Sequence, residues 1–406
     1  MGQNHLEEYE RYREIFRGRR LPLAFVDLEK FDRNVAFVAS TQSRTGKTIR
    51  VHSKSIRCVP LLRRILDTGG DAFRGVMTFT MEETAFLAEK GLDDFIVSYP
   101  TVQPTDLDLF AGLTRAGKTV SLIVDSEDHL ERLSRAGERG GVVLGACMDV
   151  DMSYRPLKTP LHLGVRRSPV RTAEDALALA RRSEDLPGVR IDSIMGYEAH
   201  IAGLNDDLPD ARIKSRILRA LKKASVRELT ERRGSVVERL RQEGLELRAV
   251  NGGGSGSLLS TGGDPSVTEV TAGSAFYAPG LFRHFKEVSF EPSAFFALQI
   301  VRRPAKGIVT CHGGGYVASG PVGEDKLPVP FLPRGCCFLP LEGAGEVQTP
   351  LKLPTGCPDL RLGDPIFFQH AKAGEIAERF NSFSLVGENR IVDRAQTYRG
   401  EGKAFL

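Results

Sequence analysis

Short apolar segments alternate with amphipathic segments eight times over roughly 230 residues, and this alternation constrains the fold more than any other feature. The apolar segments predict strands, and the amphipathic segments between them predict helices. Such a repeat favours a parallel sheet closed into a (β/α)₈ barrel. The predicted strands are residues 48–53, 73–79, 94–99, 119–125, 142–152, 191–197, 247–251 and 267–272. The predicted helices are residues 58–66, 81–90, 104–116, 126–136, 172–183 and a long stretch over 207–243.

A doubly wound open sheet is the competing α/β architecture. Its glycine fingerprint would follow the first strand. At that place this chain has Lys54, directly after the predicted strand 48–53. The barrel is therefore the favoured fold.

The last third of the chain has a different pattern. From residue 285, short β-rich runs follow one another, separated by Gly and Pro and without a helical segment between them. We therefore expect a barrel over residues 28–284 and a smaller all-β domain over residues 285–406. We expect the N-terminal segment 1–27 to form a helix and a strand, and the run 21–27 either adds a strand to the β domain or leads into the first barrel helix. The expected β-domain strands are 294–301, 307–311, 345–349, 365–369, 383–386 and 387–392.

The composition excludes several classes of function. The net charge is only +4 on 406 residues, and the basic residues occur in short groups, so no nucleic-acid partner is indicated. No run approaches eighteen apolar residues and the N-terminus is charged, so we expect a cytoplasmic protein that does not enter a membrane. The six cysteines lack zinc-finger spacing and two are adjacent, which favours reduced thiols.

A glycine cluster follows the seventh predicted strand, in the sequence Val250-Asn-Gly-Gly-Gly-Ser-Gly-Ser257. In barrel enzymes the loops after strands seven and eight commonly hold phosphate. Glycine N–H groups can converge on phosphate oxygens because no Cβ blocks the approach, and serine hydroxyls can add further donors. The cluster therefore predicts a phosphate site.

Lys54 is expected at the same barrel mouth, on the wall opposite the glycine cluster. A lysine amine becomes nucleophilic when burial or nearby cations lower its pKa. Arg50 and His52 share its strand face, and Arg57 follows it, so these three residues are the expected cations. A lysine and a phosphate site at one barrel mouth suit an enzyme that holds pyridoxal phosphate as a Schiff base.

Four motifs carry a resemblance to a known family: Arg50-Val-His-Ser-Lys-Ser55, Gly196-Tyr-Glu-Ala-His200, the glycine cluster, and Glu269-Val-Thr-Ala-Gly-Ser274. Together they resemble the fold-type III pyridoxal-phosphate enzymes, which share the alanine racemase fold. Most closely they resemble the D-threonine aldolase / D-serine dehydratase-like branch. Its members show P-H-x-K-T, Y-E-G-H, G-G-G-T/S and E-x-R-x-G at these places. The resemblance covers nearly the whole chain.

The resemblance implies pyridoxal 5'-phosphate as the cofactor and assigns roles to individual residues. Lys54 would form the Schiff base, and His200 would bind substrate or cofactor, or else be structural. The family also has an arginine near the cofactor's phenolic oxygen, after the fifth strand, and three residues here are alternatives for it: Arg155, His162 and Arg166. The residues implied around the phosphate and the ring are Tyr197, Asn251, Gly252, Gly253, Gly254, Ser255 and Tyr277.

The chain departs from the family at the metal site. Relatives place a divalent metal between a histidine and a cysteine or aspartate two residues later. Here the sequence is Gln369-His-Ala-Lys372, so lysine replaces the second ligand. An ammonium group cannot coordinate a metal, but it supplies positive charge at the same place. We favour Lys372 in place of the ion. The alternative is a metal on His370 with another ligand from Glu375, Glu378 or His312.

The resemblance implies a lyase that acts on a β-hydroxy amino acid, by aldol cleavage to glycine and an aldehyde or by dehydration. His370 is the candidate acid or base at the β-oxygen, because imidazole titrates near neutral pH. Lys54, Lys372 and His200 are the other candidate catalytic residues. An amino acid racemase and a non-catalytic pyridoxal-phosphate carrier are the alternatives, and the second domain argues against the carrier. The family further implies a head-to-tail homodimer.

Overall fold

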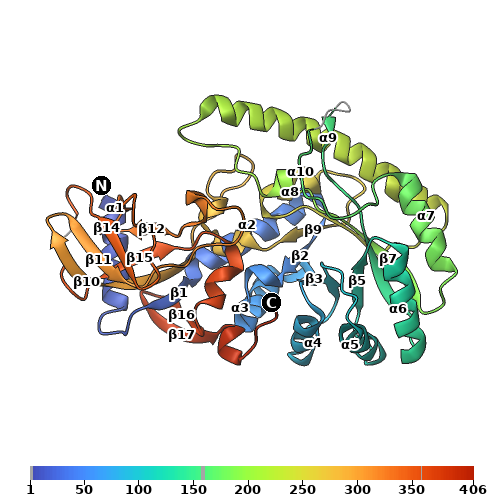
Figure 1. Ribbon diagram of the computed structural model, residues 1–406, viewed down its shortest axis with the longest axis horizontal. Helices are drawn as coiled ribbons and strands as arrows, with labels where there is room; N and C mark the ends of the chain where they lie inside the picture. The colour runs from blue at the N-terminus through green and yellow to red at the C-terminus, as the bar shows by residue number, and fades with distance from the viewer. Residues whose placement is uncertain (1–2, 157–160, 358) are drawn as a thin grey trace.

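The computed structural model describes residues 3–156, 161–357 and 359–406, which form two packed parts (Figure 1). In this view the barrel lies to the right and a mostly antiparallel β domain lies to the left. The expected fold class, a TIM-type barrel with a smaller β domain, is confirmed. Among the described residues, no helix is long and apolar enough to cross a membrane.

Eight parallel strands close the barrel in the described part of the chain. All eight expected strands are present, although the expected strands 94–99 and 142–152 are clearly shorter in the structure. Closure pairs the first strand with the last, in the register Thr48↔Glu269 to Val51↔Ala272. The strands are β2 (Thr48–His52), β3 (Phe73–Thr78), β4 (Phe95–Val97), β5 (Val120–Val124), β6 (Leu144–Asp149), β7 (Val189–Gly196), β8 (Ala249–Gly252) and β9 (Glu269–Ala272).

The closure corrects one expectation about the site. Lys54 follows β2, and the glycine cluster follows β8. Because β9 pairs with both of these strands, Lys54 and the glycine cluster lie two strands apart rather than on opposite walls.

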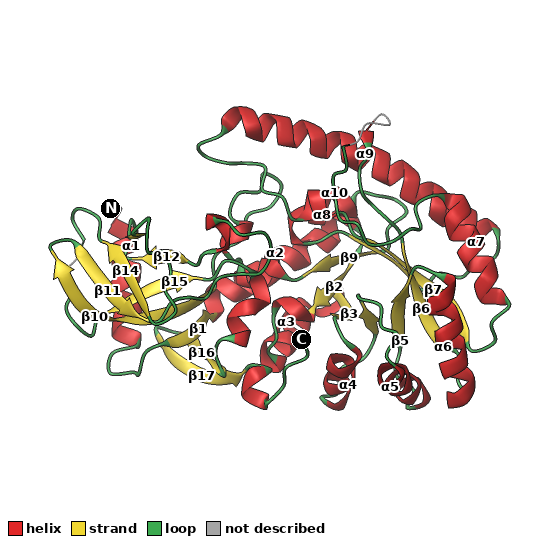
Figure 2. Ribbon diagram, viewed as in Figure 1, coloured by secondary structure: helices red, strands yellow, loops and turns green. Residues whose placement is uncertain are grey.

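Helices cover the outside of the barrel (Figure 2). Side-chain caps define several of their N-termini: Thr80 accepts from the N–H of Glu83, and Ser126 accepts from the N–H of His129. The helices are α2 (Leu28–Thr45), α3 (Val59–Gly69), α4 (Met81–Glu89), α5 (Pro104–Arg115), α6 (Glu127–Gly140), α7 (Ala173–Glu184), α8 (Ala199–Ala202), α9 (Arg212–Gln242), α10 (Leu258–Gly262) and α11 (Ser274–Tyr277).

The β domain is built on one large sheet. Two of its strands, β12 and β13, escape prediction because they are short and β12 contains Pro330. The expected run 387–392 spans a turn, since Glu388 and Asn389 adopt positive φ values of 52° and 56°. The strands are β10 (Ala294–Ala305), β11 (Ile308–His312), β12 (Val329–Leu332), β13 (Cys337–Phe338), β14 (Gln348–Lys352), β15 (Pro365–Gln369), β16 (Ser382–Gly387) and β17 (Arg390–Gln396).

The N-terminal segment joins the β domain. It forms α1 (Gln3–Ile15) and β1 (Leu23–Asp27), and β1 pairs antiparallel with β10 and parallel with β16. The structure shows both alternatives for residues 21–27: β1 adds a strand to the β domain, and its last residue, Asp27, caps α2, the helix that follows. Aromatic rings fill the space between α1 and the sheet: the Tyr12 ring centroid lies 4.9 Å from that of Phe25 and 5.6 Å from that of Phe367. The burial of these rings therefore attaches α1 to the sheet of the β domain.

A buried hydrogen bond links the two parts near the C-terminus. The hydroxyl of Tyr398 donates to Oε1 of Glu83 at 2.9 Å, and both side chains are buried. The N–H of Phe79 donates to the other carboxylate oxygen at 2.8 Å. Burial raises the pKa of Glu83 to about 7, although these hydrogen bonds oppose the rise. The six cysteines are free, and none forms a disulfide among the described residues.

Candidate active site

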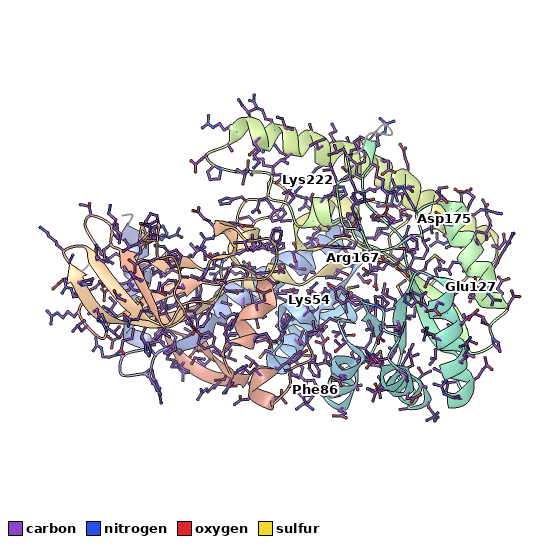
Figure 3. The ribbon with its side chains drawn as sticks, viewed as in Figure 1. Lys54, Phe86, Glu127, Arg167, Asp175 and Lys222 are labelled. Carbon is purple, nitrogen blue, oxygen red and sulfur yellow. The ribbon has the colours of Figure 1, made fainter. Side chains whose placement is uncertain are left out.

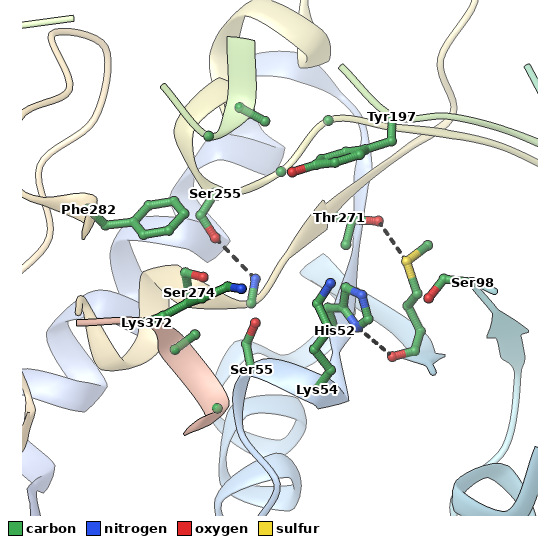
Figure 4. A pocket seen from close by; sticks show the side chains of 18 of the residues that line it. His52, Lys54, Ser55, Ser98, Tyr197, Ser255, Thr271, Ser274, Phe282 and Lys372 are labelled. Carbon is green, nitrogen blue, oxygen red and sulfur yellow. Dashed lines mark hydrogen bonds between the residues drawn. The ribbon is translucent and has the colours of Figure 1, made fainter. Parts of the chain in front are cut away.

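A cavity of about 460 Å³ lies at the carboxyl ends of the barrel strands, where the β domain meets the barrel (Figure 4). Short 3₁₀ helices contribute from both sides: η1 (Ser53–Ser55) from the barrel and η7 (Ala373–Glu378) from the β domain. The expected catalytic and cofactor residues in the cavity lining are Lys54, Tyr197, Asn251, Gly253, Gly254, Ser255 and Lys372, and the lining also contains His52, Arg57 and Glu375, which the sequence analysis named as cations and a metal ligand. The structure therefore brings together the lysine, the glycine cluster and the lysine of the β domain.

Lys54 makes its closest polar contact with Tyr99, a residue that the sequence motifs did not identify. The Lys54 ammonium donates to the Tyr99 hydroxyl oxygen at 2.6 Å. Tyr99 follows β4 (Phe95–Val97) and lines the cavity. Burial alone would raise the pKa of Tyr99, but the positive charges of Lys54, Arg167 and Lys372 lower it below its usual value. The two side chains form one hydrogen-bonded pair with access to the cavity.

The expected cations beside Lys54 are engaged elsewhere. Arg50 is buried and donates to both carboxylate oxygens of Glu269, at 2.6 and 2.9 Å. Arg57 forms an ion pair with Glu378. Burial, together with the charge of Lys54, lowers the pKa of His52 well below its usual value, so this imidazole is neutral. The expectation that Arg50, His52 and Arg57 act as free cations around Lys54 is therefore corrected.

Arg167 supplies positive charge to the cavity instead. Its guanidinium carbon lies 5.6 Å from the ring centroid of Tyr99 and 5.6 Å from that of Tyr197, a cation–π geometry on both sides. It has no ion-pair partner among the described residues. Figure 3 shows Lys54 and Arg167 near the centre of the molecule, and both line the cavity. The sequence signal for this residue was the Arg166-Arg167 doublet in the loop after β6. Of the two arginines, the motif comparison named only Arg166.

The three alternatives for the family's arginine lie outside the cavity lining. Arg155 donates to Asp151 at 2.8 Å and to Ser153 at 3.1 Å. His162 lies 3.3 Å from the carbonyl oxygen of Val165. Arg166 is exposed and is not part of the lining.

Buried charged side chains support the backbone of the glycine cluster. Gly253 has a φ of 72°, and an added Cβ would lie 2.9 Å from Oγ1 of Thr261, so glycine is required there. Its N–H donates to Glu198 Oε2 at 2.6 Å. Glu198 in turn pairs with Arg233, whose guanidinium also donates to Asp264 at 2.8 Å. This buried network fixes the loop after β8.

The backbone N–H groups that remain available to a phosphate differ from those expected. The N–H of Gly253 is engaged by Glu198, and the N–H of Gly254 donates to Ser257 Oγ at 3.1 Å. The hydroxyl oxygen of Ser255 accepts from the N–H of Gly273 at 3.1 Å, which ties the loop after β8 to the loop after β9. Among the described residues, the N–H groups of Ser255 and Ser274 have no partner, and both residues line the cavity. Two free donors beside these closely packed loops fit a phosphate group.

Several expected residues lie behind the cavity rather than in its lining. The hydroxyl of Tyr277 donates to the carbonyl oxygen of Ile56 at 2.9 Å, and its ring centroid lies 6.1 Å from that of His370. His370 is only 4% exposed, and burial lowers its pKa to about 4. His200, on α8, is half-buried, and its burial also lowers its pKa. Gly252 lies within β8. Neither histidine therefore reaches the cavity.

Lys372 faces the cavity from the β domain, as Figure 4 shows. Its ammonium donates to the Ser319 hydroxyl at 2.7 Å and lies 3.7 Å from Oε1 of Glu375. Glu375 also accepts from the N–H of Ser319 at 3.1 Å, so lysine, serine and glutamate form one polar group.

The candidate metal ligands do not converge on one point. His370 is buried behind the cavity, Glu378 is paired with Arg57, and His312 is exposed on β11. In the described part of the chain, no group of three or more His, Cys, Asp or Glu side chains could hold a metal ion. The residues around Lys372 therefore do not fit a divalent metal site.

Comparison with known proteins assigns the family. Residues 26–279 match the model of the alanine racemase N-terminal domain. The chain belongs to this family. It is 25% identical to a D-threonine aldolase of Arthrobacter sp. over 72% of this chain and 71% of that protein. It is also 25% identical to a D-threo-3-hydroxyaspartate dehydratase of Delftia sp., over 69% of this chain and 67% of that protein.

A solved structure shows the same fold. The crystal structure of D-threonine aldolase from Filomicrobium marinum superposes with a TM-score of 0.79 at 21% identity, and covers 95% of this chain and 96% of that one. The likeness extends over both the barrel and the β domain. The resemblance inferred from the motifs, to the D-threonine aldolase-like branch with the alanine racemase fold, is confirmed.

Proposed function

We propose that this protein is a pyridoxal-phosphate-dependent lyase that acts on a β-hydroxy amino acid, by aldol cleavage or by dehydration. The observation that carries the proposal is the shared cavity: Lys54, Arg167 and Lys372 line it together with Ser255 and Ser274, whose N–H groups have no partner among the described residues. An amine and an anion-binding loop are what a phosphorylated aldehyde cofactor requires. The aldolase and dehydratase names of the relatives support the choice of reaction.

The residues of the cavity fit the cofactor. Lys54 would hold its aldehyde carbon, and the N–H groups of Ser255 and Ser274 would hold its phosphate. Pyridoxal phosphate, when bound, supplies an electron sink for charge that develops at the substrate's α-carbon. Arg167 is placed to attract an anionic group of substrate or cofactor. Leu281 and Phe282 add apolar surface to the lining.

Lys372 is the group that we propose in place of the family's metal ion. It reaches the cavity from the β domain, and Ser319 orients its ammonium. A positive charge beside the substrate stabilises negative charge on the β-oxygen as the reaction proceeds. Since His370 lies behind the cavity, we no longer propose it as the acid or base at that oxygen.

A racemase remains the alternative enzyme, and the geometry counts against it. Racemisation requires two proton-transfer groups on opposite faces of the substrate. The tyrosine nearest Lys54 is Tyr99, and the two side chains are hydrogen-bonded to each other, which places them on one side of the cavity.

One experiment tests the function. Purified protein loaded with pyridoxal phosphate should show a visible Schiff-base band that borohydride abolishes, with the reduced cofactor attached to Lys54. The same preparation is then incubated with D- and L-β-hydroxy amino acids, and aldehyde, keto acid and racemate are measured separately. Attachment to another lysine, or no attachment, would contradict the proposal. Racemate as the main product would favour the alternative enzyme.

We further propose a head-to-tail homodimer, which the resemblance implies. The protein's own β domain already contributes Lys372 to the cavity, so a partner would add to the site and not replace this side. Sizing at micromolar concentration should show a dimer. A fully active monomer would contradict it.

A further inference from the structure

Within the proposed function, the proton of the substrate's β-hydroxyl needs an acceptor. The sequence offered His370, but its ring is buried behind the cavity. Glu375 is hydrogen-bonded to Ser319 and lies beside Lys372, and Glu378 is paired with Arg57. The acceptor must therefore be sought among other side chains of the lining.

Tyr99 is in the right place for this task. Its hydroxyl lies 2.6 Å from the Lys54 amine, and Lys54 is the residue that would carry the cofactor. The guanidinium carbon of Arg167 lies 5.6 Å from the centroid of its ring, and the hydrogen bond directs its hydroxyl at Lys54. We propose that Tyr99 is a catalytic residue of aldol cleavage: it accepts the proton of the β-hydroxyl and returns that proton to Lys54. This inference rests on the proposed function.

The charges around Tyr99 favour its hydroxyl as a proton acceptor over a proton donor. Lys54, Arg167 and Lys372 oppose the effect of burial and lower its pKa. Lys54 acts on it from η1, Arg167 from the loop after β6 and Lys372 from the β domain. Burial raises the pKa of the other described tyrosines whose pKa is shifted: Tyr9, Tyr12, Tyr197, Tyr277, Tyr316 and Tyr398. A tyrosine that ionises easily suits cleavage, which removes a proton from oxygen, better than dehydration, which adds one.

Tyr99 and Lys54 together carry all the proton transfers of the cleavage, and both return to their starting protonation states. The β-hydroxyl O–H bond breaks, its proton passes to Tyr99, and its electron pair forms the C=O bond of the aldehyde. The Cα–Cβ bond breaks, and its electron pair remains on the α-carbon, where bound pyridoxal phosphate would stabilise it. The substrate's amino group, entering as an ammonium, would already have displaced Lys54 from the cofactor and left its proton on the Lys54 amine. The Lys54 ammonium then protonates the α-carbon, which completes glycine. Finally, the proton on Tyr99 returns to the Lys54 amine along the 2.6 Å hydrogen bond.

Two measurements on Tyr99→Phe separate the role at the β-oxygen from a structural role. The first is cleavage of a β-hydroxy amino acid, and the second is exchange of the α-hydrogen of glycine in D₂O. Exchange needs Lys54 but no acceptor at a β-oxygen. We expect the variant to retain the cofactor band and the exchange rate, and to lose cleavage by at least about 100-fold, the scale of general base catalysis. Tyr316→Phe, which loses a tyrosine hydroxyl outside the cavity, is the matched control and should cleave normally.

A third measurement needs neither cofactor nor turnover. Tyrosinate absorbance, followed against pH in the cofactor-free protein, should show one tyrosine that ionises below the usual range. This transition should disappear in Tyr99→Phe and move to higher pH in Lys54→Met, because the ammonium that favours the phenolate is lost.

The outcomes distinguish this inference from the proposed function. If the wild-type protein binds pyridoxal phosphate and cleaves substrate while Tyr99→Phe remains within a few-fold of it, only the inference is overturned. Loss of glycine exchange in parallel with cleavage would also overturn it, since Tyr99 would then act at the α-carbon or on Lys54 alone. A titration with no easily ionised tyrosine counts against it as well. Wild-type protein without cofactor binding or cleavage would overturn both proposals.

Discussion

Gly374 of the β domain packs directly on the backbone of Lys54. A Cβ added to Gly374 would lie 1.8 Å from the carbonyl oxygen of Lys54 and 3.0 Å from the side-chain Nε of Arg57. That carbonyl already accepts a hydrogen bond from Arg57 Nε at 3.0 Å. Because Gly374 lies two residues after Lys372, this contact fixes the spacing of the two lysines across the cavity.

Gly374→Ala should therefore disturb the site. The methyl group must push η7 away from η1, with a cost of about 1–3 kcal/mol that is typical of overpacking. We expect weaker pyridoxal-phosphate binding and slower turnover, measured by titration of the cofactor band and by initial rates. Gly234→Ala is the control, since Gly234 lies on α9 with nothing within 4 Å of an added Cβ. If both variants bound the cofactor and turned over equally well, the close packing of Gly374 on Lys54 would not be needed for the site.

The arginine doublet after β6 offers a matched pair of substitutions. Both arginines are exposed, but only Arg167 lines the cavity and contacts the Tyr99 and Tyr197 rings. Arg167→Leu should weaken binding of an anionic cofactor or substrate by about 1.5–3 kcal/mol, the range of a hydrogen bond to a charged group. Arg166→Leu should change the affinities little. Cofactor titration and KM measurements on both variants check this, and a larger effect at Arg166 would contradict the assignment.

Lys372 provides the test of metal independence. If its ammonium takes the place of the ion, cleavage should survive exhaustive chelation. Lys372→Met should then slow turnover far more than the chelator does, by a few kcal/mol in transition-state stabilisation. Lys352→Met, an exposed lysine on β14, is the control for loss of one positive charge from the β domain. Loss of activity on chelation, with recovery on addition of manganese or zinc, would show that a metal is required.

The raised pKa of Glu83 predicts how the free energy of unfolding depends on pH. Its pKa is raised by burial to about 7 in the folded protein, above the value near 4.5 of an exposed glutamate. The folded state therefore holds this proton more tightly than the unfolded state does. The stabilisation is complete below about pH 4.5, falls as pH rises through about 7, and amounts to about 3 kcal/mol.

Glu83→Gln should remove this contribution, because the amide does not titrate and can still accept from Tyr398. The free energy of unfolding, measured by denaturant titration of both proteins between pH 5 and 8, should decline less steeply with pH in the variant. Parallel curves would contradict the raised pKa of Glu83.

The sequence by itself determined the order of the elements and the main chemical groups. Periodicity separates strands from helices because a half-buried strand repeats every two residues and a helix every 3.6. The fold class followed, and so did the positions of Lys54 and the glycine cluster at strand ends. These are local properties of the chain, and each can be recognised within a short window.

Only the tertiary structure decided which groups share the cavity. Barrel closure pairs β2 with β9, so residues more than two hundred positions apart become neighbours. The fold brings Tyr99 to Lys54 and places Arg167, rather than Arg166, in the lining of the cavity. It also buries His370, which the sequence presented as a reactive group. Burial, pairing and side-chain direction depend on contacts between distant segments, and no local pattern encodes them.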